Sequence, residues 1–448
     1  MGSDKEIIGE ENGGRQTTVR KLRHERYLTF ENVALWVFLV TNLGMYYPML
    51  LPLVWLGYLL AFAALGLRLY KLRGIPLSTA PFIGISGLYV LFCYMSVFWA
   101  FNPEFCMDSD GRLLRTVLMS WVVCILVRTR RQWHMAMVFV ALAAVINGLL
   151  YLQFVDLTKL AAARFNSQLA SNVDGLPHLN VVAMYVAFAA VYFMSELTDR
   201  RNKPDWVTIG IVALMIVSMV LVFLFGSRKS ILTVVAGVFL YIMAASSGMR
   251  KLQMACLAAI VVCLLIAILP PEYIEFVIKR LFGTFDSDKH LAPEDRFRLR
   301  MIENAGEYIA QSPIVGHGFY NFSELFGRDT GTYLYAHNNI LETLTDGGII
   351  GFIIYYSIYF IILRNWYLTR KSNPSMFLVA VFMTLILLNG FLIVYLSEQF
   401  IWIMLSLMYI GSRGFRSDAD EKTILGRRVR KVKARKQFPA ADNVNRIG

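Results

Sequence analysis

The chain has 448 residues, of which 57% are hydrophobic and 17% charged, and its mean hydropathy is +0.53, whereas an ordinary soluble domain has roughly 25% charged residues. Apolar runs near the roughly 20 residues that cross a bilayer recur along almost the whole sequence, which excludes the alternating pattern of barrel strands. The net charge of +13 comes from short basic blocks between these runs, so we interpret it as a topology signal and expect no nucleic-acid partner.

Twelve apolar runs predict an all-α polytopic membrane protein with about twelve transmembrane helices. The basic segment at 20–26 leads into the first run without a small-residue cleavage site, so we expect no cleaved signal peptide. The predicted spans are 30–44, 46–68, 81–101, 113–127, 134–154, 179–195, 206–225, 229–247, 252–270, 339–363, 376–394 and 397–411.

The basic blocks test this topology, because cytoplasmic loops of membrane proteins carry an excess of Lys and Arg. They occur at 20–26, 68–73, 128–131, 200–203, 250–251, 364–371 and 413–436. All of them fall on one side of a twelve-span topology, so both termini should be cytoplasmic. The loops 101–111 and 155–177 then lie on the opposite side.

This topology divides the chain into five parts. They are a basic cytoplasmic N-terminus (1–27), helices 1–9 (28–270), a long extracytoplasmic loop (271–337), helices 10–12 (338–411) and a basic cytoplasmic tail (412–448). The tail is expected to be attracted to anionic membrane lipids, since each basic charge near the leaflet contributes about 1 kcal/mol.

Redox and metal chemistry are not expected from the cysteines. Four of the five lie inside apolar runs, and Cys106 alone falls in a connecting loop. The sequence therefore predicts neither a disulfide framework nor a metal cluster.

The first polar feature on the outer side is the short link 226–230 between two apolar runs. It places Arg228 and Lys229 at the mouth of a helical hairpin. Two adjacent cations there are costly unless they face an aqueous cavity or an anion. Because outer loops normally lack such charge, we favour anion binding over the alternative, side chains that extend to the membrane interface.

The second feature is a predicted helix that begins near Arg296 and ends at Ser312 and Pro313. Its apolar residues recur at helical spacing: Phe297, Met301, Ile302, Ala305, Tyr308 and Ile309. Arg298 lies near the start, where backbone amides also favour an anion. Planar guanidinium groups suit phosphate oxygens, so we expect Arg296 and Arg298 to bind phosphate. For Arg300 a solvated position is an equal alternative.

The third feature is His337, which lies where the outer loop re-enters the membrane. Asn338 and Asn339 follow it, and Glu342 lies four residues beyond Asn338 on one side of a helix. A lone histidine is usually structural, but one on the same side as the arginines can handle a proton. His317, between two glycines, is a weaker candidate that we assign to a tight turn.

These segments together resemble the bacterial O-antigen ligase and O-antigen polymerase superfamily, WaaL-like and Wzy-like. The matching pieces are Gly226-Ser227-Arg228, then Arg298 in the pattern Arg-x(14)-Pro-x-x-Gly-x-Gly, then His337-Asn338-Asn339-x-Leu341 followed by Gly347, Gly348 and Gly351. The C-terminal half matches specifically, and the first two hundred residues match in hydropathy alone. Two departures are Lys229 after Gly-Ser-Arg and Asn339 where an Asp is common.

The resemblance implies a GT-C-like, inverting glycosyltransferase that needs neither metal nor cofactor. Its donor would be an undecaprenyl pyrophosphate-linked oligosaccharide and its acceptor a glycan or a lipid-linked glycan. It implies that Arg228 and Arg298 bind the pyrophosphate and that His337 assists the acceptor hydroxyl. We add Lys229 and Arg296 to the pyrophosphate site, and Asn338, Asn339 and Glu342 as supporting residues. The loop 271–337 would then be catalytic.

Several functions remain open at this point. The first interpretation is a Wzy-like polymerase of polysaccharide repeat units, because the paired Asn338-Asn339 and Lys229 look more like capsule polymerases. The alternatives are a WaaL-like ligase acting on lipid A core, an O-linked protein glycosylation ligase and, outside enzymes, a glycolipid transporter. The expected location is the bacterial cytoplasmic (inner) membrane in a cell envelope pathway of polysaccharide biosynthesis, with the active site on the extracytoplasmic face. A chain-length regulator is a further candidate partner.

Overall fold

A computed structural model describes the chain at residues 29–154, 179–199, 205–244, 293–371, 376–392, 394 and 396–415. Throughout these ranges the regular structure is helical, with no β-strand. The prediction of an all-helical protein is therefore confirmed.

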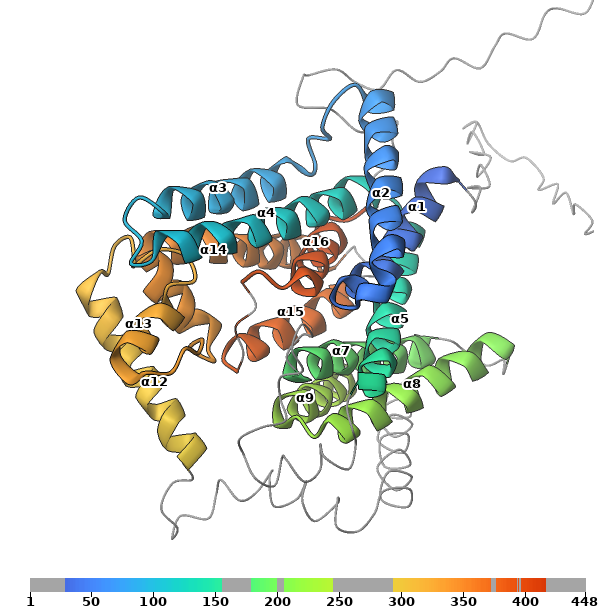
Figure 1. Cartoon of the computed structure of the whole chain (residues 1–448). Helices are drawn as coiled ribbons and strands as arrows, with labels where there is room; N and C mark the ends of the chain where they lie inside the picture. The colour runs from blue at the N-terminus through green and yellow to red at the C-terminus, as the bar shows by residue number, and fades with distance from the viewer. Residues whose placement is uncertain are drawn as a thin grey trace, which may run out of the picture.

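Figure 1 shows the helices in chain order. They are α1 (Phe30–Thr41), α2 (Leu51–Leu72), α3 (Ala80–Ser96), α4 (Pro103–Leu126), α5 (Arg130–Phe154), α7 (Leu179–Asp199), α8 (Trp206–Phe225), α9 (Arg228–Ala244), α12 (Pro293–Gln311), α13 (Phe322–Thr330), α14 (Asn339–Thr369), α15 (Met376–Gly390) and α16 (Gln399–Arg413). Two short 3₁₀ helices, η1 (Asn42–Tyr46) and η2 (Pro48–Leu50), join α1 to α2.

Five helices of the described part are long and apolar enough to cross a membrane, which identifies a multi-pass membrane protein. They are Pro48–Leu72, Arg130–Phe154, Leu179–Leu197, Trp206–Phe225 and Asn339–Thr369. Each coincides with a predicted span. Four further predicted spans fall on shorter apolar helices, α1, α3, α9 and α15. The predicted span 252–270 lies outside the described residues, and the count of twelve stays a prediction.

A single apolar core joins most of these helices. The last helix, α16, packs against α4, α5, α14 and α15, and its residues from Gln399 to Ser412 are all buried. Helix α3 lies alongside α4 and α14, while α7 packs against α5, α8 and α9 (Figure 1). Helices α12 and α13 form a separate unit at the edge of the molecule, attached through α14.

Helix α4 differs from the expected element. The sequence predicted a loop at 101–111 before a short span, but the helix begins at Pro103, directly after the N-cap residue Asn102. The Asn102 side chain accepts a hydrogen bond from Phe105 N at 3.2 Å, and Pro is well suited to the first helical position. The polar residues that suggested a loop are distributed around the first half of this helix.

Candidate active site

The unit that carries the candidate residues has a small apolar core of its own. Met301, Ala305 and Tyr308 of α12 pack against α13 and against Ala336, the residue before His337. These three residues confirm the predicted apolar face of the helix. Ile302, assigned to the same face, is 51% exposed, so that assignment was wrong: the buried stripe of α12 is narrower than the apolar residues suggested.

The segment from Pro313 to Gly318 docks against α14 where that helix is broken at Gly348, whose φ is 58° and ψ −161°. Gly348 interrupts the helix and exposes backbone groups. These backbone groups form hydrogen bonds with the docked segment: Ile349 N donates to Pro313 O at 2.9 Å, and Ile350 N donates to Ile314 O at 3.2 Å. On the other side, His317 N donates to Thr345 O at 2.9 Å.

The glycines of the matching pattern permit this close approach. A Cβ on Gly316 would lie 2.3 Å from the Asp346 carbonyl oxygen, and one on Gly348 would lie 2.4 Å from Ile314 backbone atoms. Both glycines also have positive φ, at 69° and 58°, which favours glycine. The Pro-x-x-Gly-x-Gly and Gly-Gly patterns are thus two halves of one backbone junction.

Asp346 fastens the start of α13 to this junction. Its fully buried carboxylate accepts hydrogen bonds from Tyr320 N at 2.8 Å and Phe322 N at 2.9 Å. Backbone N–H groups at a helix start are suited to a negative charge. No role was predicted for Asp346 from the sequence.

His317 is a structural residue, as the turn assignment predicted. Its Nε2 lies 2.8 Å from Tyr308 O, its carbonyl accepts from Phe101 N at 2.9 Å, and positive-φ glycines flank it. It joins α12, the loop before α4 and the broken helix.

His337 lies immediately before the N-cap of α14 and has a left-handed backbone, with φ at 53°. A non-glycine residue with positive φ is uncommon and marks a site that the surroundings enforce. Its ring lies against that of Tyr335, with the centroids 4.1 Å apart. The side chain is half-buried, so it combines a fixed position with access from outside.

The supporting residues hold this turn in different ways. The Asn338 side-chain oxygen caps α14 by accepting from Ile340 N at 2.9 Å, so its role is in helix capping. The buried Asn339 donates to the Tyr356 hydroxyl at 3.3 Å. Glu342 Oε2 accepts from Ala336 N at 2.6 Å, which ties the helix to the residue before His337.

Glu342 also has a carboxylate oxygen that makes no hydrogen bond within the described part of the chain. Its side chain is fully buried, and among the described residues Oε1 has no hydrogen-bond partner. A buried polar atom without a partner is costly unless it serves a function. This oxygen therefore belongs with His337 as a candidate for handling a substrate.

Two tyrosines connect Glu342 to charges on other helices. Tyr335 interacts electrostatically with Glu342, Glu398 and Arg298. Tyr320 interacts with the same two carboxylates and with Arg112, whose guanidinium carbon lies 5.7 Å from the centre of its ring. Burial raises the pKa of the Tyr335 hydroxyl, which keeps this group neutral. Through these two tyrosines, the carboxylates of Glu342 and Glu398 share electrostatic partners with an arginine of α12 and an arginine of α4.

Of the four residues predicted to bind the pyrophosphate, the structure describes the side chains of Arg298 and Lys229. Arg298 is half-buried and near Tyr335, but it is the sixth residue of α12, which begins at Pro293. The charge effect of a helix end falls off within the first turn, so the expected help from the helix start is small. The side chain of Arg296 lies outside the described residues.

The Gly-Ser-Arg segment forms a tight connection between two helices. Gly226 ends α8 with a φ of 53°, and its N–H donates to Phe223 O at 2.8 Å. Helix α9 begins at Arg228, whose side chain lies outside the described residues, and Lys229 is half-buried. Helix α9 packs against α7, α8 and α15, whereas α12 packs against α13 and α14.

Asp108 and Asp110 are two residues apart, a spacing that could present two carboxylates to one cation. They point to opposite sides of α4, because the Asp108 side chain is 81% exposed and Asp110 is fully buried. No group of three or more His, Cys, Asp or Glu side chains gathers at a metal-binding distance anywhere in the described ranges.

Sequence reasoning missed Arg112, Tyr320 and Glu398, which come from three different segments. Arg112 had a signal, since it interrupts the outer end of an apolar stretch, and charge in such a place is functional by default. Glu398 stands alone between two apolar runs. Neither residue could be assigned to the site without knowing that α4 and α16 pack together.

Three of the candidate residues lie in a stretch that matches a known protein family. Residues 211–356 match the family model described as O-antigen ligase, a stretch that includes Arg228, Arg298 and His337. A search of curated proteins found no match. The matched stretch contains the α8–α9 connection, α12, α13 and the broken start of α14, and this match supports the resemblance to the O-antigen ligase and polymerase superfamily that the sequence motifs indicate.

Proposed function

We propose that this protein is a metal-independent, inverting glycosyltransferase that moves a whole oligosaccharide from undecaprenyl pyrophosphate to a hydroxyl of an acceptor glycan. The family match supports glycan transfer. The acceptor in this proposal is a second lipid-linked repeat unit, which makes the enzyme a Wzy-like polymerase of the cytoplasmic membrane. The reaction takes place on the extracytoplasmic face.

The chemistry requires a proton acceptor and fixed positive charge. The acceptor oxygen attacks the anomeric carbon, and its proton passes to the His337 imidazole. The bond from that carbon to the pyrophosphate breaks, and the electron pair leaves with the lipid pyrophosphate. Arg298, together with Arg228, Lys229 and Arg296, stabilises the charge on this leaving group, a task that fixed cations can perform without a metal.

One observation carries the proposal: a histidine in an enforced left-handed turn packs on a tyrosine that interacts electrostatically with a half-buried arginine. His337 packs on Tyr335, and Tyr335 interacts electrostatically with Arg298. Glu342 holds the backbone of the turn through Ala336 N. Moving a glycolipid without forming a bond requires no general base, whereas glycosyl transfer requires one near the cation that stabilises the leaving group, so this arrangement favours an enzyme.

Deletion of the gene in its source bacterium tests the proposal. A polymerase mutant retains single repeat units but loses the ladder of longer polysaccharide. A ligase mutant instead builds the ladder on the lipid carrier and fails to transfer it to lipid A core or protein. An unchanged ladder with an unchanged attachment would contradict both glycosyltransferase functions, and accumulation of substrate on the cytoplasmic side alone would indicate a transporter.

A further inference from the structure

The outer half of α4 has one continuous exposed face. The exposed residues recur every three or four positions, as expected for one side of a helix: Pro103, Glu104, Met107, Asp108, Gly111, Arg112 and Arg115. The opposite side, with Cys106, Asp110 and Leu113, is buried. Two arginines therefore occupy the inner end of this face and two carboxylates the outer end.

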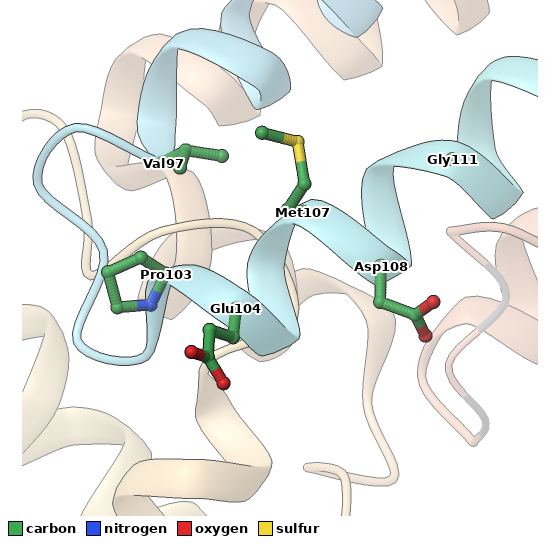
Figure 2. A pocket seen from close by; sticks show the side chains of 6 residues that line it. All are labelled: Val97, Pro103, Glu104, Met107, Asp108 and Gly111. Carbon is green, nitrogen blue, oxygen red and sulfur yellow. The ribbon is translucent and has the colours of Figure 1, made fainter.

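An open groove of about 690 Å³ follows the outer end of this face. Its lining residues are Val97, Pro103, Glu104, Met107, Asp108 and Gly111. Figure 2 shows Val97 and Met107 pointing toward one another, while Glu104 and Asp108 project from the same side of the helix. The groove ends at Gly111, the residue before Arg112.

The arginines at the inner end are only partly neutralised by nearby acidic groups. Arg112 donates to Ser109 Oγ at 2.9 Å and lies 4.0 Å from the exposed carboxylate of Asp108. It also interacts electrostatically with the half-buried Glu398. In the described part of the chain, Arg115 has no carboxylate within salt-bridge distance.

The face is attached to the candidate active site at both ends. At the outer end, Asn102 Nδ2 donates to Glu324 Oε2 of α13 at 2.8 Å, and α13 packs against Ala336. Farther in, Thr116 Oγ1 donates to Ser397 O at 3.2 Å, and Ser397 Oγ lies 2.7 Å from the Tyr320 hydroxyl.

From these contacts we infer that the exposed face of α4 binds the acceptor substrate: Arg112 and Arg115 hold its pyrophosphate, and the groove from Gly111 to Pro103 holds its sugars. This inference rests on the proposed function, because a polymerase must bind two lipid pyrophosphates at once. Arg298 belongs to α12 and Arg112 to α4, and each interacts with a different tyrosine, Arg298 with Tyr335 and Arg112 with Tyr320, so each of the two anions has an arginine of its own. The groove carboxylates can accept hydrogen bonds from sugar hydroxyls.

A transfer assay with separate donor and acceptor tests the inference. The donor is a lipid pyrophosphate-linked repeat unit whose terminal hydroxyl is methylated, so that it can donate but not accept. The acceptors are the same oligosaccharide on lipid pyrophosphate and as an uncharged methyl glycoside. Wild-type protein in nanodiscs of zwitterionic lipid should have a lower KM for the charged acceptor.

In the double variant Arg112→Ala/Arg115→Ala we expect the KM for the charged acceptor to rise about tenfold or more, because both charged contacts are lost. The KM for the methyl glycoside and the KM for the donor should stay as in the wild type. Arg112→Lys/Arg115→Lys should recover part of the loss, since a point charge remains without the planar fork. Arg300→Ala, which removes an exposed arginine of α12, is the matched control and should change neither KM.

Each other outcome contradicts the inference in a recognisable way. Equal losses with both acceptors would show that the arginines do not bind the pyrophosphate. A defect that appears only in nanodiscs of anionic lipid, and that does not depend on the acceptor, would assign the face to bulk lipid headgroups. Absence of transfer by the folded wild-type protein would instead contradict the proposed function itself.

Discussion

His337 and His317 are both in the family-matching half of the chain, but the structure gives them different tasks. His317 is bonded to Tyr308 and to the loop before α4 through its ring and its backbone. His337 lies in a strained turn against Tyr335, with a half-buried ring. Rigid attachment of the neighbouring backbone holds such a ring ready for a substrate.

Replacing His337 tests its proposed role as proton acceptor. A general base contributes roughly 10²–10⁴-fold in rate, so His337→Ala should reduce turnover by that order and leave donor binding nearly intact. If the neutral imidazole accepts the proton, the rate of the wild type rises with pH as the imidazole deprotonates. The rate of His337→Gln should lack this rise. Retention of more than about a tenth of wild-type turnover would be less than the usual loss and would make Glu342 the next candidate.

His317→Ala is the control for His337→Ala. It removes the ring contact to Tyr308 O, and loss of one such hydrogen bond costs about 0.5–1.5 kcal/mol of stability. We expect lower thermal stability with turnover close to that of the wild type. A loss of turnover as large as in His337→Ala, at unchanged stability, would show that the two roles were assigned wrongly.

Arg298→Ala tests the leaving-group site. Removing one partner of a charge-assisted contact costs about 2–5 kcal/mol when the contact is desolvated, so the rate with limiting donor should fall about thirtyfold or more, because about 2 kcal/mol corresponds to roughly thirtyfold. Arg298→Lys should restore part of the loss. Normal expression with transfer at the wild-type rate would remove Arg298 from the pyrophosphate site.

At the scale of elements, the main feature is the junction between the segment 313–318 and the broken start of α14. The helix is broken at Gly348, and the docked segment bonds the backbone groups that the break exposes. The junction fixes where α12, α13 and the turn at His337 stand relative to the membrane helices. Its precision depends on backbone atoms rather than on side chains.

Substitution by alanine distinguishes the glycines of this junction from glycines elsewhere in the chain. Gly316→Ala and Gly348→Ala each add a Cβ within 2.4 Å of backbone atoms at a positive φ, so we expect misfolded or inactive protein. Gly331 has a φ of 73° and open space around it. Gly331→Ala should therefore cost no more than the about 1–2 kcal/mol of left-handed strain and keep activity.

Gly306 provides a control position at which alanine is expected to stabilise the protein rather than destabilise it. It lies within α12, with no atom within 4 Å of the place where a Cβ would stand. An alanine there should stabilise the protein by about 0.5–1 kcal/mol, because glycine is unfavourable inside a helix. Thermal unfolding of the four glycine variants measures the contrast, and equal destabilisation of all of them would contradict the junction.

For the whole molecule, the sequence predicted the class of fold well, because hydropathy follows directly from what a bilayer requires of a helix. The five long apolar helices coincide with predicted spans. The start of α4 was predicted wrongly, since polar residues on a helix within the protein resemble a loop until the packing of both faces is known. Asn102 and Pro103 were the local signals of the true start.

The site was predicted less completely than the fold. His337, Arg298 and Glu342 stand in one stretch with recognisable spacing, and the structure brings them to one region. Arg112 and Glu398 reach that region from distant parts of the chain, and no spacing within one segment could reveal them. Asn338 was predicted as a supporting residue beside His337, and in the structure its side chain caps α14, because position, rather than residue type, decides what an amide binds.

The membrane topology can be tested by labelling single cysteines with a reagent that does not cross the membrane. Cys93, Cys106 and Cys124 are buried and can stay in place, while Cys256 and Cys263 are replaced by Ser. Thr332→Cys, on the exposed loop before α14, should react in intact cells, and Arg430→Cys should react after lysis alone. Reaction of the second position and protection of the first would reverse the orientation.

The central claim is that this protein forms a glycosidic bond by releasing lipid pyrophosphate without a metal. The direct measurement uses purified protein in nanodiscs with a labelled lipid pyrophosphate-linked oligosaccharide in excess EDTA. The account predicts a ladder of longer products, with one free lipid pyrophosphate released for each bond formed. Unchanged substrate, or activity that returns only with added magnesium or manganese, would contradict it.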